Sequence, residues 1–287
     1  MKLKKSIAGI LILLILSISV LVGCAEKEAA KNTDLILATT TSTQDTGLLD
    51  FLIPRFETKT GYKVKTVAVG TGKALAMAEK GNADVVLTHA MKSEKPLVDK
   101  QLVVDYTLVM HNDFVIVGPA EDPAGIKGLN TAKEAFAKIA EVEAIFISRG
   151  DDSGTHKKEL DIWASTGIKP SGNWYLESGQ GMGQTLHIAS EKGAYTLTDR
   201  GTYLAQQKNI KLDILMQGDK PLLNIYHVMA VNPAKFSKVN YDGAKAFVDF
   251  MKAPETQKLI ADFGKDKYDG QGLFVPDAGK TVEEIQN

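Results

Sequence analysis

Cysteine and arginine are both scarce in this chain of 287 residues. The single cysteine, Cys24, excludes an intrachain disulfide and a zinc site built on several cysteine ligands. Only three of the 34 cationic residues are arginines: Arg55, Arg149 and Arg200. The net charge of −1 leaves no excess of basic residues, so we do not expect a nucleic acid partner.

Sequence signatures of common enzymes are missing as well. The five histidines are scattered, with no H-E-x-x-H pair, and there is no G-x-S-x-G motif. A zinc receptor with several histidine ligands stays open, although no spacing supports it. Ser153 and His156 suggest a hydrolase with a nucleophile and its base, but their separation of three residues favours a local role at a helix start. We therefore predict no enzyme activity, no cofactor and no metal site.

The N-terminus is typical of a targeting segment. A cationic start is followed by an apolar run from Ser6 to Val22, then by Gly23 and Cys24. A small residue followed by cysteine resembles a bacterial lipoprotein signal, which predicts a signal peptide over 1–23 and an acylated Cys24. An uncleaved anchor helix is the alternative. Cleavage would remove three lysines and no acid, which takes the net charge from −1 to −4.

The segment 24–33 is small and polar, so it is expected to be a lipidated tether, with the folded part beginning near Asp34. These features predict an extracytoplasmic protein anchored by lipid to the outer face of the cell membrane, or held in the periplasm.

The remaining chain alternates short apolar strands with helical patterns, which indicates α/β layers. The first block reads as β-α-β-α-β, a doubly wound start. The expected strands are 35–38, 62–69, 84–88, 114–117, 145–148, 194–197 and 222–231. The expected helices are 48–56, 73–80, 131–140, 157–165, 184–192, 201–208, 241–251 and 255–263.

Two long apolar segments, 109–117 and 223–231, flank a middle block of the chain. If both cross between lobes, residues 34–112 and 228–287 form lobe I and residues 113–227 form lobe II. A single large doubly wound domain is the alternative.

The loop Thr39–Gly47 (TTTSTQDTG) lies between an expected strand and an expected helix. In α/β sheets this is the edge that binds ligands, and a helix start favours anions. Capping the helix is the alternative function, but capping needs one hydroxyl and this loop has five in a row, from Thr39 to Thr43. We therefore expect a ligand loop.

Two further loops have the same position after a strand. Gly70-Thr71-Gly72-Lys73 allows close backbone approach, although it is also a plausible tight turn and is not a Walker loop. Ser148–His156 (SRGDDSGTH) places Arg149, a cation suited to oxyanions, beside a helix start. Arg149 paired with Asp151 or Asp152 is the alternative. Arg200, next to Asp199, is expected to be paired or solvated rather than bound to a ligand.

These loops, together with VVLTHA (85–90) and HNDFVIVG (111–118), resemble substrate-binding lipoproteins of bacterial tungstate ABC importers. The resemblance covers nearly all of 34–275. It implies an α/β, type II periplasmic-binding-protein-like fold with two lobes, each a doubly wound sheet, and a ligand cleft between them. It also implies a monomer that binds one oxyanion, most closely tungstate, and delivers it to an ABC permease with a cytoplasmic ATPase.

By the same resemblance, eight residues are expected to contact the ligand: Thr40, Thr41, Ser42, Thr71, Arg149, Ser153, Gly154 and Thr155. Three helix starts at roughly 0.5 charge each and one arginine give about 2.5 positive charges, enough for a dianion. Molybdate and sulfate stay open. Phosphate does too, because Asp45 or Asp152 offers an acceptor for its proton.

Overall fold

The computed structural model describes residues 33–268 and 270–286. The predicted signal peptide and the acylated Cys24 lie outside the described residues. The strands are β1 (Asp34–Thr40), β2 (Lys63–Val69), β3 (Val85–Thr88), β4 (Val103–Gly118), β5 (Phe146–Ser148), β6 (Tyr175–Glu177), β7 (Thr196–Asp199), β8 (Asp213–Met216), β9 (Leu223–Val231) and β10 (Val275–Pro276). The helices are α2 (Thr41–Asp45), α3 (Leu48–Thr60), α4 (Thr71–Glu79), α5 (Met91–Asp99), α6 (Ala132–Glu141), α7 (Gly154–Thr166), α8 (Met182–Lys192), α9 (Arg200–Gln206), α10 (Tyr241–Lys252), α11 (Pro254–Asp262) and α12 (Val282–Gln286), with 3₁₀ turns at Gln207–Asn209 and Lys220–Leu222.

The doubly wound start predicted from the sequence is confirmed. Strand β1 lies between β2 and β3 and is parallel to both. Because the three strands run in the same direction, their carboxyl ends meet at one edge of the sheet. This edge therefore carries the segments that follow Thr40, Val69 and Thr88.

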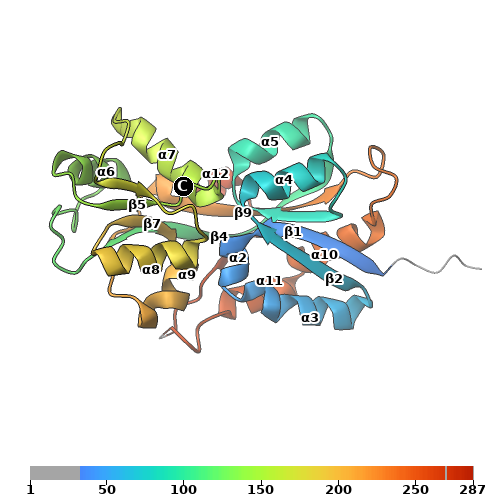
Figure 1. Cartoon of the computed structure of the whole chain (residues 1–287). Helices are drawn as coiled ribbons and strands as arrows, with labels where there is room; N and C mark the ends of the chain where they lie inside the picture. Colours follow the sequence, from blue (N-terminus) through green and yellow to red (C-terminus); the bar gives the residue numbers. More distant parts are fainter. Residues whose placement is uncertain (1–32, 269, 287) are drawn as a thin grey trace, which may run out of the picture. The chain divides into compact units, whose positions relative to one another are not determined.

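Alternate side chains of these strands enter different hydrophobic clusters. Leu37 packs in a cluster with Leu49 and Phe56 of α3, whereas the next residue, Ala38, packs with Ala74 of α4. This period of two is typical of a strand buried on both faces. Figure 1 shows the result, with α4 and α5 on one side of these strands and α3 and α11 on the other.

Strand β4 is 16 residues long and takes part in both halves of the sheet. Between Val103 and Asp113 it pairs with β9, and between Phe114 and Gly118 it pairs with β7 and β8. These pairings are antiparallel, as is that of β3 with β9, so neither half is a purely parallel sheet. The expected crossing segment 109–117 lies within this strand, while β9 pairs along its length with β3 and β4.

The structure contains two helices near the expected ligand loops that the sequence patterns did not predict. Helix α2 occupies Thr41–Asp45, where a loop was expected, and α5 follows β3. Within residues 33–286, Asp269 excepted, no helix has the length and apolar content needed to span a membrane. The boundaries predicted for the two lobes stay a prediction.

Candidate functional site

The parallel strand edge brings together three polar segments of the first half of the chain. Thr40 ends β1 and leads into α2, Thr71 opens α4 after β2, and His89 follows β3. All three side chains are buried, with Thr71 fully inaccessible to solvent. The sheet topology therefore places hydroxyl groups and one imidazole in a common environment.

Thr40 is the centre of a hydroxyl cluster. Its Oγ1 lies 2.6 Å from Oγ1 of Thr43, 3.2 Å from Oγ of Ser42 and 3.1 Å from Nε2 of His89. It also accepts a hydrogen bond from the backbone N–H of Thr43 and so caps α2. Helix capping, the alternative considered for this loop, thus explains one hydroxyl of the run but not the others.

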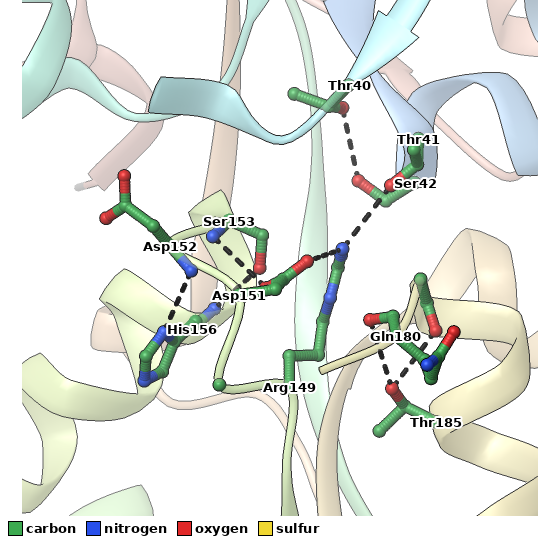
Figure 2. A network of polar contacts seen from close by, with 12 residues as sticks. Thr40, Thr41, Ser42, Arg149, Asp151, Asp152, Ser153, His156, Gln180 and Thr185 are labelled. Carbon is green, nitrogen blue, oxygen red and sulfur yellow. Dashed lines mark hydrogen bonds and ion pairs between the residues drawn. The ribbon is translucent and has the colours of Figure 1, made fainter. Parts of the chain in front are cut away.

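The loop after β5 supplies the only buried arginine among the described residues. The Arg149 side chain is 2% exposed, and its Nη2 donates to Oδ2 of Asp151 at 2.5 Å and to Oγ1 of Thr41 at 3.3 Å. Figure 2 shows Arg149 extending from its own loop between Asp151 and Thr41. Arg149 therefore lies against the hydroxyl loop, as expected, and also pairs with Asp151, which was the alternative.

Helix α7 begins directly against the first half of the chain. A methyl group added to Gly154 would lie 2.7 Å from Cε1 of His89 and 3.2 Å from Oγ1 of Thr71. Glycine fits here because any larger side chain would collide with these groups. The start of α7 thus closes onto the ends of β2 and β3.

Four buried polar atoms in this region have no hydrogen-bond partner. They are Oγ1 of Thr71, Oγ1 of Thr155, Nε of Arg149 and Nδ1 of His89. A buried polar group without a partner costs about 1–3 kcal/mol, so such atoms are rare in folded proteins. Their concentration at one place, on segments from both halves of the chain, indicates a site that a polar ligand completes.

Two of the eight predicted residues have local roles. Ser153 caps α7, because its Oγ accepts from the backbone N–H of His156 at 3.1 Å. Nδ1 of His156 in turn accepts from the backbone N–H of Asp152. Ser153 and His156 therefore support the helix start, as the sequence separation suggested, and do not form a nucleophile and base. Gly154 provides space, as described above.

Carboxylates lower the positive charge of the site below the value expected from the sequence. Asp151 neutralises Arg149, and Asp45 lies close enough for the Arg149 charge to act on it. Burial raises the pKa of Asp45, while Arg149 and the backbone N–H of Gly183 oppose that rise. The expectation of about 2.5 positive charges is therefore wrong, since it left out the charges of Asp151 and Asp45 and assumed a full helix start after the hydroxyl loop, where the structure has α2, a helix of only five residues.

The other candidate groups lie elsewhere or are occupied. Arg200 forms a two-pronged ion pair with Asp113, at 2.6 Å through each nitrogen, rather than the expected pair with Asp199. Asp152 is exposed and pairs with Lys157 at 2.8 Å. Among residues 33–268 and 270–286, no three histidine, cysteine, aspartate or glutamate side chains gather as a metal site would require.

His89 is the main site residue that the sequence analysis missed. It was set aside because no second histidine lay at a metal-binding spacing. The signal that identifies it is its position, one residue beyond a buried strand that is parallel to β1.

Comparisons with known proteins place the chain among anion-binding transport proteins. Residues 25–255 match the model of the PBP superfamily domain. The tungstate-binding protein TupA of Peptoclostridium acidaminophilum is 48% identical over 260 residues, which cover 90% of each chain.

Two solved structures are also similar. The tungstate ABC transporter structure from Geobacter sulfurreducens is 53% identical with a TM-score of 0.74, and the match covers 80% of this chain and 98% of that one. The tungstate-binding protein TupA from Desulfovibrio alaskensis G20 is 49% identical with a TM-score of 0.72, over 85% of this chain and 99% of that one.

Proposed function

This chain belongs to the PBP superfamily, and we propose that it is an extracytoplasmic receptor for a tetrahedral oxyanion, tungstate above all. The fold is the two-lobed type of periplasmic-binding proteins. The observation that carries the proposal is the group of buried, unpartnered polar atoms of Thr71, Thr155 and Arg149. An oxyanion accepts hydrogen bonds at every oxygen, so one guest can satisfy several donors at once.

The hydroxyl groups of Thr41 and Ser42 join this set from the start of α2. Backbone amides join it from the start of α4, whose N-cap, Gly70, makes no side-chain cap bond. The positive end of a helix favours an anion, and hydrogen bonds to a charged acceptor contribute about 1.5–3 kcal/mol each.

Binding from both halves of the chain explains how the anion is retained. Thr41 and Thr71 lie on the first half and Arg149 and Thr155 on the middle block, so the full set of donors exists only when the two segments meet. A ligand that binds this state better shifts the population toward it. We infer that the lobes close on tungstate by bending where β4 passes from β9 to β7.

Relatives named for tungstate binding and for a tungstate ABC transporter support delivery to an ABC permease driven by a cytoplasmic ATPase. Acylation of Cys24 would hold the receptor, as a monomer, at the outer face of the membrane. No role in catalysis is proposed, because Ser153 and His156 lack the arrangement of a nucleophile and base.

Titration calorimetry with tungstate, molybdate, sulfate and phosphate tests this function. Tungstate should bind with 1:1 stoichiometry and should stabilise the fold by about 4 kcal/mol at a thousandfold excess over the dissociation constant. Tighter binding of another of these anions would reassign the ligand within the same class. Indifference to all four anions would overturn the proposed function.

A further inference from the structure

The positive charge around the oxyanion site falls short of that of a dianion. The Arg149 guanidinium is already paired with Asp151 at 2.5 Å, so these two groups together add no net charge. The starts of α4 and α7 together contribute about one positive charge equivalent. A dianion bound here would therefore leave about one negative charge unbalanced in a buried place.

His89 is the described group best placed to make up the difference. The residue is 7% exposed, and its ring lies close to Gly154 of α7 and to the ring of Tyr226 of β9. Nε2 is 3.1 Å from Oγ1 of Thr40 and 3.3 Å from Oγ of Ser42. The imidazole thus lies between the hydroxyl cluster and the second half of the site.

The other ring nitrogen faces the Asn224 side chain. Burial lowers the pKa of His89 and the nearby Asn224 side chain opposes that effect, yet neither Nδ1 of His89 nor Oδ1 of Asn224 has a hydrogen-bond partner. The amide nitrogen of Asn224 is occupied by Asn112 and Tyr226. A proton on Nδ1, donated to Oδ1 of Asn224, is therefore the arrangement that satisfies both atoms.

With the proton on Nδ1, the bare Nε2 must accept a hydrogen bond. One of the hydroxyls of Thr40 and Ser42 then donates to His89 and is lost as a donor to a ligand. A second proton on Nε2 reverses this direction, because Nε2 then donates to those oxygens. Both hydroxyl hydrogens become available to an anion, and the ring gains a positive charge beside it.

We propose, building on the function proposed above, that the oxyanion is bound together with one proton, which is taken from solvent and held on Nε2 of His89. The dianion and the proton thus enter the site as a pair whose net charge is −1. Oxyanion binding and proton binding to the receptor then strengthen each other by the same factor.

The groups that surround His89 explain why it is neutral without a ligand. Burial lowers the pKa of His89 to about 4, the Glu94 carboxylate of α5 opposes that effect, and Arg149 adds to it. Tyr226 stays protonated, because burial raises its pKa well above the usual value. A bound dianion would raise the pKa of His89, as the Glu94 carboxylate does, but from within the ligand site.

Proton uptake can be measured on the unmodified protein. Tungstate is titrated into the receptor in two buffers of different ionisation enthalpy, such as HEPES and Tris. Phosphate buffer is avoided, because phosphate is itself an oxyanion. We expect uptake of about one proton per tungstate, and an affinity that falls by up to about tenfold per pH unit while the pH lies between the pKa of unliganded His89, about 4, and the higher pKa of liganded His89.

Variants assign the proton to its residue. His89→Gln should bind tungstate more weakly and without proton uptake, whereas the control His187→Gln, on α8, should retain the uptake of the unmodified chain. Asp45→Asn should retain it too, which excludes Asp45 as the acceptor. Two results would overturn the role given to His89 and leave the oxyanion-receptor function intact. One is proton uptake that persists in His89→Gln, and the other is tungstate binding without proton uptake between about pH 7 and pH 9. Absence of tungstate binding at every pH would instead overturn the proposed function, and this proposal with it.

Discussion

Arg149 has two partners whose effects on an anion are opposite. Its Nη2 donates to Thr41 and its Nε has no partner and can donate to a ligand, but the carboxylate of Asp151 balances its charge. Its fork of nitrogens therefore acts by orientation as much as by net charge.

Replacement Arg149→Ala should remove most tungstate affinity, by a hundredfold or more, which corresponds to about 3 kcal/mol. The variant loses the donor and also leaves the Asp151 carboxylate unpaired beside the anion. Calorimetry measures the loss, and the exposed Arg55→Ala serves as the matched control. Binding by Arg149→Ala as tight as that of the unmodified chain would refute this role.

Replacement Asp151→Asn should raise tungstate affinity, by roughly tenfold. An asparagine still offers an oxygen to the backbone N–H of Ser153, which now bonds Oδ1 of Asp151 at 3.2 Å, but it no longer cancels the charge of Arg149. Dissociation constants measured side by side at one ionic strength give the answer. Weaker binding would mean that Asp151 matters for orienting Arg149 more than for charge.

The sequence predicted the hydroxyl loop, the glycine loop and the arginine loop, because each has more hydroxyl, glycine or charged residues than a turn or a helix cap requires. His89 lies in none of these loops, and Asp45, within the hydroxyl loop, is suggested by the sequence only as an acceptor for the proton of phosphate. Their roles depend on which strands are neighbours and on the loop Ser148–His156, which lies about 60 residues beyond His89 and about 100 beyond Asp45 in the chain, and local sequence shows neither.

Helix α7 is the element through which the middle of the chain meets the strand edge. Gly154 at its start leaves room for His89 and Thr71, with no space for a methyl group. Most elements around it were predicted correctly, because their hydrophobic periodicity is clear. Helix α5 was missed since its nine residues include two lysines and a proline, and α2 was missed because short turns of polar residues read as loop.

Replacement Gly154→Ala should weaken tungstate binding by tenfold or more, because the methyl group holds α7 away from His89. The unliganded fold should keep its stability, since alanine is the better helix former. Thermal melts with and without tungstate separate the two effects. An undiminished ligand-induced shift would show that the segments meet more loosely than described.

The same helix carries a buried carboxyl that makes stability depend on pH. Glu159 accepts from Tyr175 at 2.7 Å and Trp163 at 3.2 Å, and burial raises its pKa from 4.5 to about 7. Between these values the folded chain keeps a proton that the unfolded chain has lost. The free energy of unfolding should therefore fall by about 3 kcal/mol as the pH rises from about 4.5 to about 7.

Glu159→Gln should remove this contribution while keeping an oxygen for both donors. Urea unfolding at several pH values measures it. The variant should be more stable than the unmodified chain above about pH 7 and should lose less stability across the interval. Parallel pH profiles for the two proteins would contradict the assignment to Glu159.

At the scale of the whole molecule, the proposed function combines a site that closes with a lipid tether. The sequence predicted α/β layers because the alternation of strands and helices is strong, and it predicted two lobes through the resemblance, which spans both halves. It did not predict the antiparallel pairings of β4, which join segments far apart in the chain.

Replacement Cys24→Ala should release the protein from the membrane fraction or block its processing, because acylation needs the thiol. Fractionation of cells that express the full chain, with detection in both fractions, measures the outcome. Retention of the variant at the membrane with normal acylation would contradict the proposed anchor.

The length of β4 is itself under constraint. Its irregular pairings with β9 lie before Met110, and from there to Asp113 the ladder is regular. Val115 and Val117 face one hydrophobic cluster and Phe114 and Ile116 another. Insertion or deletion of one residue in this stretch would move each following side chain of β4 to the opposite face of the sheet. Relatives of this receptor should therefore vary in length in their surface turns and hold this segment constant to the residue.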